Sequence, residues 1–250
     1  MINKLIKNDI EYQLTSRNMK ALFTGKTEHL RHFDPKIVKL EMSQGLNDYV
    51  QEDESIRLPN PQILQMTLDD AMEKRCSRRD FQCHNITLQE LSTLLFYAAG
   101  YKRTEHNGRK HVPSSGGFST TELFFVVLHS EEVPLGLYYF SAKDFSISCL
   151  QKGDFAEWVR NDALYQEEWC KASIIVFLAS DYTRLYQKYN HRTLRLCLLD
   201  AGHMAQNLYL TCAAMDMKVC EVLGYVENEA EEAFRLTGNT PTYASIVIGR

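Results

Sequence analysis

From residue 87 onward, apolar residues follow a helical period in some segments and form short continuous runs in others. The segment 87–100 has apolar side chains at positions 88, 91, 94, 95 and 98, the spacing of one helical face. A capping box at Thr87 and Glu90 predicts where this helix begins, and Gly100 predicts where it ends. Within 192–217, residues 198–215 are apolar nearly all round, which predicts a central helix buried on several sides.

The short apolar runs predict the strands of one sheet. The runs at 123–128 and 172–180 have the length and composition of strands buried on both faces. Further strands are predicted at 136–140 and 145–150, which form a hairpin, and at 219–226 and 243–248; further helices are predicted at 154–170 and 228–236. Strands that alternate with helices around a hairpin predict an α+β fold with helices packed on a mixed sheet.

Residues 1–60 differ from the rest of the chain. They are polar and mixed in sign, and the stretch 45–58 is acidic with little apolar periodicity. Pro59-Asn60-Pro61 forms a natural boundary, because proline disfavours helix at its own position and at the residue before it. We therefore expect an N-terminal extension at 1–60, a candidate region for substrate or partner docking, and one domain at 61–250.

Overall charge restricts the kinds of ligand. The 250 residues contain 28 Lys and Arg against 32 Asp and Glu, a formal net charge of -4. Such a chain has no global positive field to attract nucleic acid or an anionic membrane, so an anion site must be local. Apolar runs fall short of the roughly 18 residues of a membrane span. Because Asn8, Asp9 and Glu11 interrupt the place of a signal-peptide core, we expect a cytoplasmic protein.

The seven cysteines indicate neither disulfides nor zinc. Their number is odd, they are scattered, and none stands in a C-x-x-C pair. Reduced and mostly buried thiols, with no metal site, are therefore expected.

A cluster of four cations and one hydroxyl, residues 74–79, is the sharpest charge feature. Guanidinium groups bind phosphate oxygens bidentately and a serine adds a donor, so the cluster fits one phosphate group. A solvated basic helix end explains it equally well. The chain has neither a dinucleotide-binding glycine fingerprint nor a P-loop, so a nucleotide would be held in another way.

The loop Pro113-Ser114-Ser115-Gly116-Gly117 precedes a predicted strand. Paired glycines allow a backbone to approach a ligand closely, and the serines offer hydrogen-bond donors. Taken alone, the same residues are more often a simple turn.

The order of these motifs resembles the flavin-dependent nitroreductase superfamily and, within it, the SagB-like azoline dehydrogenases that mature thiazole- and oxazole-containing peptides. The likeness runs from residue 73 to the C-terminus. It rests on Arg75, Ser77, Arg79 and Phe81; the 113–117 loop followed by Glu122; residues 136–139; Lys188-Tyr189 followed by Arg192 and Arg195; and Asp200-Ala201-Gly202-His203 with 206–208. Two departures are Phe118-Ser119-Thr120 in place of Leu-Tyr-Pro, and Leu194 in place of a tyrosine.

The resemblance implies FMN as cofactor and a homodimer with FMN at the interface. It also implies the FMN contacts, which are Arg75, Ser77, Arg79 and Arg250 at the phosphate, Pro113, Ser114, Ser115 and Gly116 along the isoalloxazine, and the main chain of Leu223 and Gly224 near N5. The fold it implies is a nitroreductase-like sheet flanked by helices, with a long buried central helix.

The same resemblance implies that Lys188 or Tyr189 is the catalytic base, without ordering the two. In the alternative reading the pair is structural: Tyr189 packs against its neighbours and Lys188 is solvated. His203 is read as a core histidine. The implied reaction oxidises thiazoline or oxazoline rings of a peptide or small molecule, with partner proteins of a biosynthetic complex. An NAD(P)H-dependent reductase of a nitroarene, quinone or dehydroamino acid is one alternative. A non-catalytic scaffold subunit is the other.

Overall fold

The computed structural model describes residues 49, 54–103, 109–236 and 238–250. Most of the predicted 1–60 extension, including the segment around Asn8, lies outside these residues. The described chain is α+β, as predicted. Its strands are β1 (Ser55–Arg57), β2 (Thr121–Val127), β3 (Gly136–Ser141), β4 (Ser146–Lys152), β5 (Ile174–Ser180), β6 (Lys218–Val222) and β7 (Thr242–Gly249).

One seven-stranded sheet contains all of these strands in the order β1-β4-β3-β2-β5-β7-β6. The six strand pairs are antiparallel, and the parallel component of the sheet is the isolated bridge between Ser77 and Val219. The central strands β2 and β5 are buried along their whole length, which explains their continuous apolar runs. The predicted hairpin is β3–β4.

Helices cover both faces of the sheet. They are α3 (Leu68–Lys74), α4 (Leu88–Ala99), α5 (Ala156–Trp158), α6 (Tyr182–Tyr189), α7 (Thr193–Ala214) and α8 (Glu227–Ala233), with short turns η4 (Ser115–Gly117), η5 (Val159–Ala163), η6 (Glu167–Lys171) and η7 (Asn190–Arg192). The helix predicted at 87–100 is α4, which carries the predicted capping box, and the central helix is α7.

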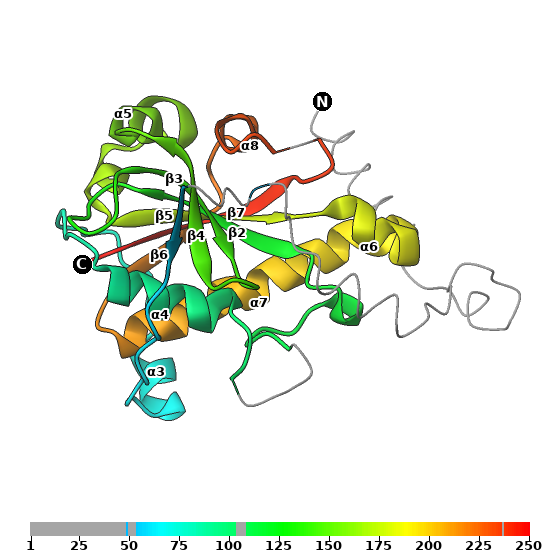
Figure 1. Cartoon of the computed structure of the whole chain (residues 1–250), viewed down its shortest axis with the longest axis horizontal. Helices are drawn as coiled ribbons and strands as arrows, with labels where there is room; N and C mark the ends of the chain where they lie inside the picture. Colours follow the sequence, from blue (N-terminus) through cyan, green and yellow to red (C-terminus); the bar gives the residue numbers. More distant parts are fainter. Residues whose placement is uncertain (1–48, 50–53, 104–108, 237) are drawn as a thin grey trace, which may run out of the picture.

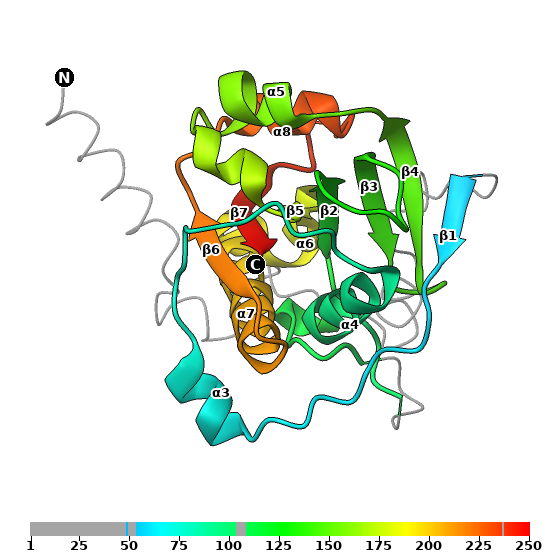
Figure 2. The same ribbon diagram turned by 90° about the vertical axis from the view of Figure 1, so that its left-hand side faces the viewer.

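Two apolar cores separate three layers (Figure 2). One core joins α4 and α7 to the sheet through side chains such as Leu94, Met204 and Val176. The other joins the opposite face to α5, α8 and their connections, with Trp169 and Phe177 at its centre. All seven cysteines are free and five are buried, as predicted.

The single helix predicted at 154–170 is wrong. After α5, a π-helical turn at 159–163 leads to Tyr165, whose φ of +53° breaks the helix, and a short 3-10 turn follows. The break turns Trp169 back into the core, where its ring lies 6.0 Å from that of Phe81. Tertiary packing thus overrides the local helical period.

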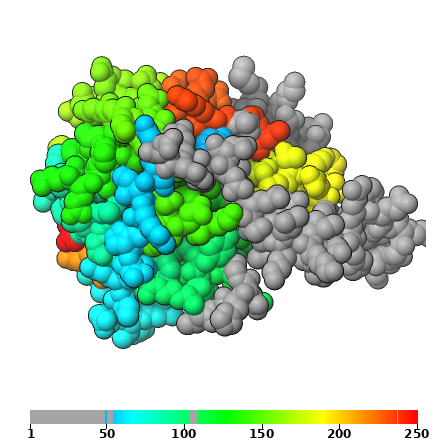
Figure 3. Space-filling view, in the orientation of Figure 1, coloured from blue at the N-terminus to red at the C-terminus, as the bar shows by residue number. Residues whose placement is uncertain are grey.

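Strand β1, with helices α3 and α6, has no counterpart among the predicted elements. β1 pairs with β4, and Leu58 beside it is buried in the core, so the sheet begins before the predicted boundary at Pro59. Such a three-residue edge strand is too short to show a period. From β1 the chain runs down the surface to α3 (Figure 3).

His203 is exposed on α7, which corrects its reading as a core histidine. It lies one turn after Leu199, which is 53% exposed, on a face of α7 that leaves large apolar side chains uncovered. An apolar pattern on all sides of a helix cannot show which side faces solvent.

Candidate functional site

The C-terminal end of α6 carries Lys188 and Tyr189. Asp181 caps the start of this helix through its side chain, and Asn190, at a φ of +48°, ends it. Both side chains reach the loop 113–117, which precedes β2. Two motifs far apart in the sequence therefore meet at one place.

Gly116 lies at the closest approach between the two motifs. Its φ is +62°, in the left-handed region that favours glycine. A methyl group here would overlap the Tyr189 hydroxyl oxygen and lie 3.2 Å from Lys188 Nζ. The backbone conformation therefore favours glycine, and any larger residue would have to displace the Tyr189 hydroxyl.

Asp200 of α7 anchors the loop from the other side. Its carboxylate accepts hydrogen bonds from the Ser115 backbone N–H at 2.9 Å and the Ser115 hydroxyl at 3.0 Å. Burial raises the pKa of Asp200, while these hydrogen bonds and nearby His203 oppose the rise. Ser115 thus gives both donors to α7, and the Ser114 hydroxyl accepts from the Ser119 N–H.

Phe118 supports the lysine. Lys188 Nζ lies 5.2 Å from the centre of the Phe118 ring and 5.3 Å from that of Tyr189, within cation–π range. Phe118 is 1% exposed. One of the residues that departs from the expected Leu-Tyr-Pro sequence is therefore part of the surroundings of Lys188.

A hollow of about 320 Å³ is lined by residues of α3, the second half of α7 and the C-terminal Arg250. Figure 1 shows that α3 and the C-terminus lie at the end of α7 away from α6. The hollow is strongly cationic. Its lining contains Lys74, Arg75, Cys76, Arg78, Gln82, Tyr209, Ala213, Asp216, Met217, Lys218, Val219 and Arg250. Of the four residues predicted to bind the phosphate, Arg75 and Arg250 line the hollow, whereas Ser77 and Arg79 do not; Arg78 lines it instead of Arg79.

Three cations of the hollow are paired with carboxylates. These pairs are Lys74 Nζ with Asp216 at 2.9 Å, Lys218 Nζ with Asp80 at 2.8 Å, and Arg250 Nη2 with Glu90 at 2.7 Å. Hydrogen bonds from the lysines lower the pKa values of Asp80 and Asp216. The carboxylates keep the cations close together in spite of their mutual repulsion.

Tyr209 lines the hollow and contacts three of the residues around it. Its hydroxyl lies 2.9 Å from the Ser77 hydroxyl and accepts a hydrogen bond from the Glu221 N–H at 2.8 Å. The Arg75 guanidinium lies over its ring at 5.7 Å. No motif in the sequence marks Tyr209, which comes from the buried half of α7.

The hollow fits a phosphate group by the chemistry of its donors. Arg250 Nε is buried and has no hydrogen-bond partner among the described residues, so this donor is unsatisfied. Arg75, Arg78 and the Ser77 hydroxyl supply further donors close by.

Comparison with known proteins shows the family to which the chain belongs. The model of the Nitroreductase family matches residues 72–250. The chain belongs to the nitroreductase family. MJ1384 of Methanocaldococcus jannaschii, named as a nitroreductase, is 29% identical over 183 residues, 73% of this chain and 91% of that protein. The family assignment makes this protein an oxidoreductase by relationship.

Solved structures share the nitroreductase fold. A protein of Ralstonia eutropha JMP134 described as a nitroreductase has a TM-score of 0.67 at 22% identity, covering 80% of this chain and 91% of that one. The Escherichia coli microcin synthetase McbBCD complex with truncated pro-MccB17 bound has a TM-score of 0.62 at 14% identity, covering 99% and 93%. At identities of 22% and 14%, the similarity to these structures shows a shared fold.

Leu223 and Gly224 follow β6 in this nitroreductase-family chain. Leu223 is 65% exposed, and no atom lies within 4 Å of a methyl group placed on Gly224. Leu223 is therefore largely exposed, and the space beside the Gly224 Cα is open. Arg79 is also exposed.

Among the described residues no His, Cys, Asp and Glu side chains gather as a metal site would require. Within the same residues, no helix combines the length and apolar character needed to cross a membrane.

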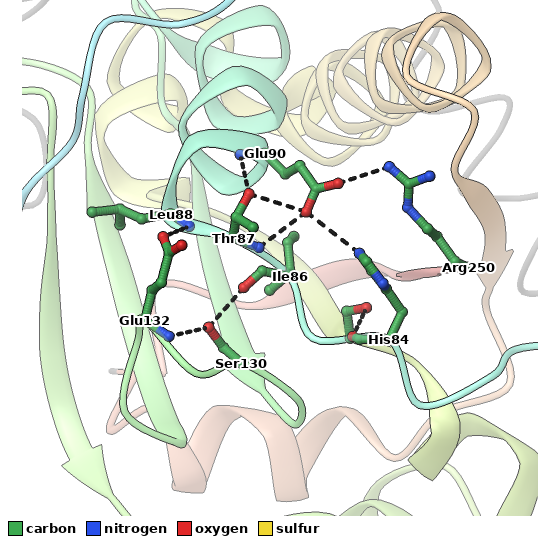
Figure 4. A network of polar contacts seen from close by, with 9 residues as sticks. His84, Ile86, Thr87, Leu88, Glu90, Ser130, Glu132 and Arg250 are labelled. Carbon is green, nitrogen blue, oxygen red and sulfur yellow. Dashed lines mark hydrogen bonds and ion pairs between the residues drawn. The ribbon is translucent and has the colours of Figure 1, made fainter.

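A network of polar contacts centred on Glu90 joins Arg250 to the start of α4 (Figure 4). The Thr87 N–H and hydroxyl donate to Glu90 at 3.0 and 3.1 Å, and His84 Nε2 lies 3.4 Å away. Burial raises the pKa of Glu90, but the hydrogen bonds from Thr87 and Arg250 outweigh it and lower the pKa below its ordinary value.

We predict that Glu90→Gln removes an acid-sensitive part of the stability. Since the folded pKa of Glu90 lies below its ordinary value of 4.5, its charged form stabilises the native state at neutral pH, and this contribution disappears as the pH falls below that value. The difference in melting temperature between wild type and Glu90→Gln should shrink between about pH 7 and about pH 3. Thermal unfolding across this range measures it, and a constant difference would contradict the prediction.

Proposed function

We propose that this protein is an FMN-dependent oxidoreductase of the SagB type that dehydrogenates thiazoline or oxazoline rings of a peptide to azoles. The observation that carries the proposal is the meeting of Lys188 and Tyr189 with the glycine loop at Gly116. A basic side chain and a phenol beside a close-approach loop are what removal of a carbon-bound proton requires. The fold shared with the McbBCD complex over 99% of the chain is consistent with this branch.

The cofactor phosphate would bind in the cationic hollow. Arg75, Ser77 and Arg250 would hold it there, with Arg79 reaching it from the exposed segment after Ser77. The proposed contacts of the ring system are the loop residues Pro113, Ser114, Ser115 and Gly116 and the main chain of Leu223 and Gly224, which follow β6.

In the proposed reaction, bound FMN supplies the acceptor for a hydride from the substrate ring carbon. Lys188 and Tyr189 supply the base that takes the proton from the carbon next to the carbonyl. The two are joint candidates, because both side chains reach the loop at Gly116 and the distances do not order them. Asp200 fixes the loop against which both groups pack.

A second copy of the chain would complete the site. The glycine loop is anchored at Asp200 and the hollow is lined by Ala213, thirteen residues later on α7, which separates them by about 20 Å along the helix. Leu198 and Leu199 of α7 are 50% and 53% exposed, an apolar surface of the kind that a symmetric partner covers. We therefore propose a homodimer with FMN at the interface, working with a peptide substrate and partner proteins.

The test is the visible spectrum of the purified protein. We expect bound FMN in the wild type, released by acid, and a much weaker flavin signal in Arg75→Ala. Under anaerobic conditions a synthetic azoline peptide should bleach the flavin, and NADPH should not. A protein that never binds FMN would instead be the scaffold subunit.

A reductase is the second candidate, because MJ1384 carries the name nitroreductase and is 29% identical. In that case hydride would pass from NAD(P)H to a nitroarene, quinone or dehydroamino acid. Rapid bleaching by NADPH, with none by the azoline peptide, would favour the reductase over the dehydrogenase.

A further inference from the structure

Arg250 directly follows β7, and its backbone is held by one hydrogen bond from the segment after α3. Its carbonyl accepts a hydrogen bond from the Gln82 N–H at 2.6 Å, directly after β7. The side chain is 40% exposed at the edge of the hollow. A long side chain at this position would sample many rotamers without a second contact.

Glu90 supplies that contact from a fixed position. Its two carboxylate oxygens have separate partners: Oε2 accepts from the Thr87 N–H and hydroxyl and lies near His84, while Oε1 accepts from Arg250 Nη2 at 2.7 Å. The Glu90 side chain is 16% exposed. With Oε2 bound by the helix cap, Oε1 faces the Arg250 guanidinium (Figure 4).

Building on the proposed function, we propose that Glu90 is a positioning residue that holds the Arg250 guanidinium ready for the FMN phosphate. A guanidinium has five N–H donors, and Glu90 takes one at Nη2. Nε remains buried without a partner among the described residues. A cation that is oriented before binding loses less conformational freedom when phosphate arrives, so the affinity for phosphate rises.

The opposite expectation follows if Glu90 acts only through its charge. A carboxylate beside the hollow would then repel the phosphate and compete for Arg250, and its neutralisation would strengthen FMN binding. The positioning model predicts that neutralising Glu90 weakens FMN binding, and the charge model predicts that it strengthens FMN binding. We favour positioning because the Thr87 N–H and hydroxyl bind one carboxylate oxygen of Glu90, while the other oxygen accepts a hydrogen bond from Arg250.

The chain offers a variant that breaks the pair and leaves the helix cap in place. Gln is accepted at this position of a capping box, and its one oxygen can replace Oε2. The amide nitrogen would then face Arg250 and cannot accept from it. Glu132→Gln is the matched control: Glu132 accepts from the Leu88 N–H at 2.7 Å at the same helix start, and Arg250 is not its partner in the network.

The experiment measures FMN and riboflavin binding to the full-length apoprotein by quenching of flavin fluorescence. For Glu90→Gln we expect FMN binding to weaken about tenfold, which is about 1.4 kcal/mol, with riboflavin binding unchanged. Glu132→Gln should bind both flavins as the wild type does. In an Arg250→Ala background, Glu90→Gln should have no further effect on FMN.

Three results would overturn the inference. Unchanged or tighter FMN binding by Glu90→Gln would show that the carboxylate does not position Arg250. Equal weakening of FMN and riboflavin, or the same loss in Glu132→Gln, would assign the effect to the helix start. A wild type that binds riboflavin and FMN equally, or neither, would remove the proposed phosphate site itself, and the inference with it.

Discussion

Tyr189→Phe should retain bound FMN and oxidise an azoline peptide about 10²–10⁴-fold more slowly than the wild type, the range expected when a general base is lost. Lys188→Ala should lose activity in the same way. Neither side chain lines the cationic hollow that is proposed to hold the FMN phosphate, so we expect both variants to keep the cofactor. The measurement combines the flavin spectrum of each variant with single-turnover bleaching by the peptide.

Tyr186→Phe is the matched control for this prediction. Tyr186 lies one turn earlier on α6, is 40% exposed, and stacks on Tyr182 at 5.8 Å. Loss of its hydroxyl should leave the reaction unchanged. Normal turnover in both Tyr189→Phe and Lys188→Ala would remove the assignment of the base, while loss of flavin from either would mean that the pair is structural.

Gly116→Ala should lower turnover by about 100-fold and destabilise the protein. An alanine at a φ of +62° costs about 1–2 kcal/mol. The new methyl group would also displace the Tyr189 hydroxyl, and misplacement of a catalytic group by about 1 Å is enough for a loss of this size. Turnover and the free energy of unfolding are the two measurements.

A double-mutant cycle separates the two causes. Tyr189→Phe removes the atom that the methyl group would overlap, so Gly116→Ala should destabilise the Tyr189→Phe variant less than the wild type. Gly238→Ala is the control glycine, because its methyl group would have no atom within 4 Å. Equal destabilisation by Gly116→Ala in both backgrounds would show that backbone strain alone is responsible.

Local sequence patterns are sufficient to predict the main helices and strands. The capping box at Thr87 and Glu90 and the apolar period behind it depend on neighbouring residues, and the structure has both. The runs that became β2 and β5 are buried on both faces, and such strands show in a sequence without reference to partners. The break at Tyr165 was not predictable, because it results from the packing of Trp169 against Phe81.

For the candidate sites, too, some features are visible in the sequence and others only in the folded structure. The amino-acid sequence alone shows which candidate groups are available: the basic cluster at 74–79, the glycine loop at 113–117 and the Lys188-Tyr189 pair. Their order also determined the likeness to a family, which the match over 72–250 confirms.

Tertiary structure alone decided which of these residues meet. It placed Lys188 and Tyr189 against Gly116, made Phe118 a support for the lysine, and connected Ser77 to Tyr209. It also paired Arg250 with Glu90, a residue whose sequence signal is only that of a helix cap. Contacts between distant segments depend on how the chain folds back across the sheet, and no local sequence pattern shows which distant residues will meet.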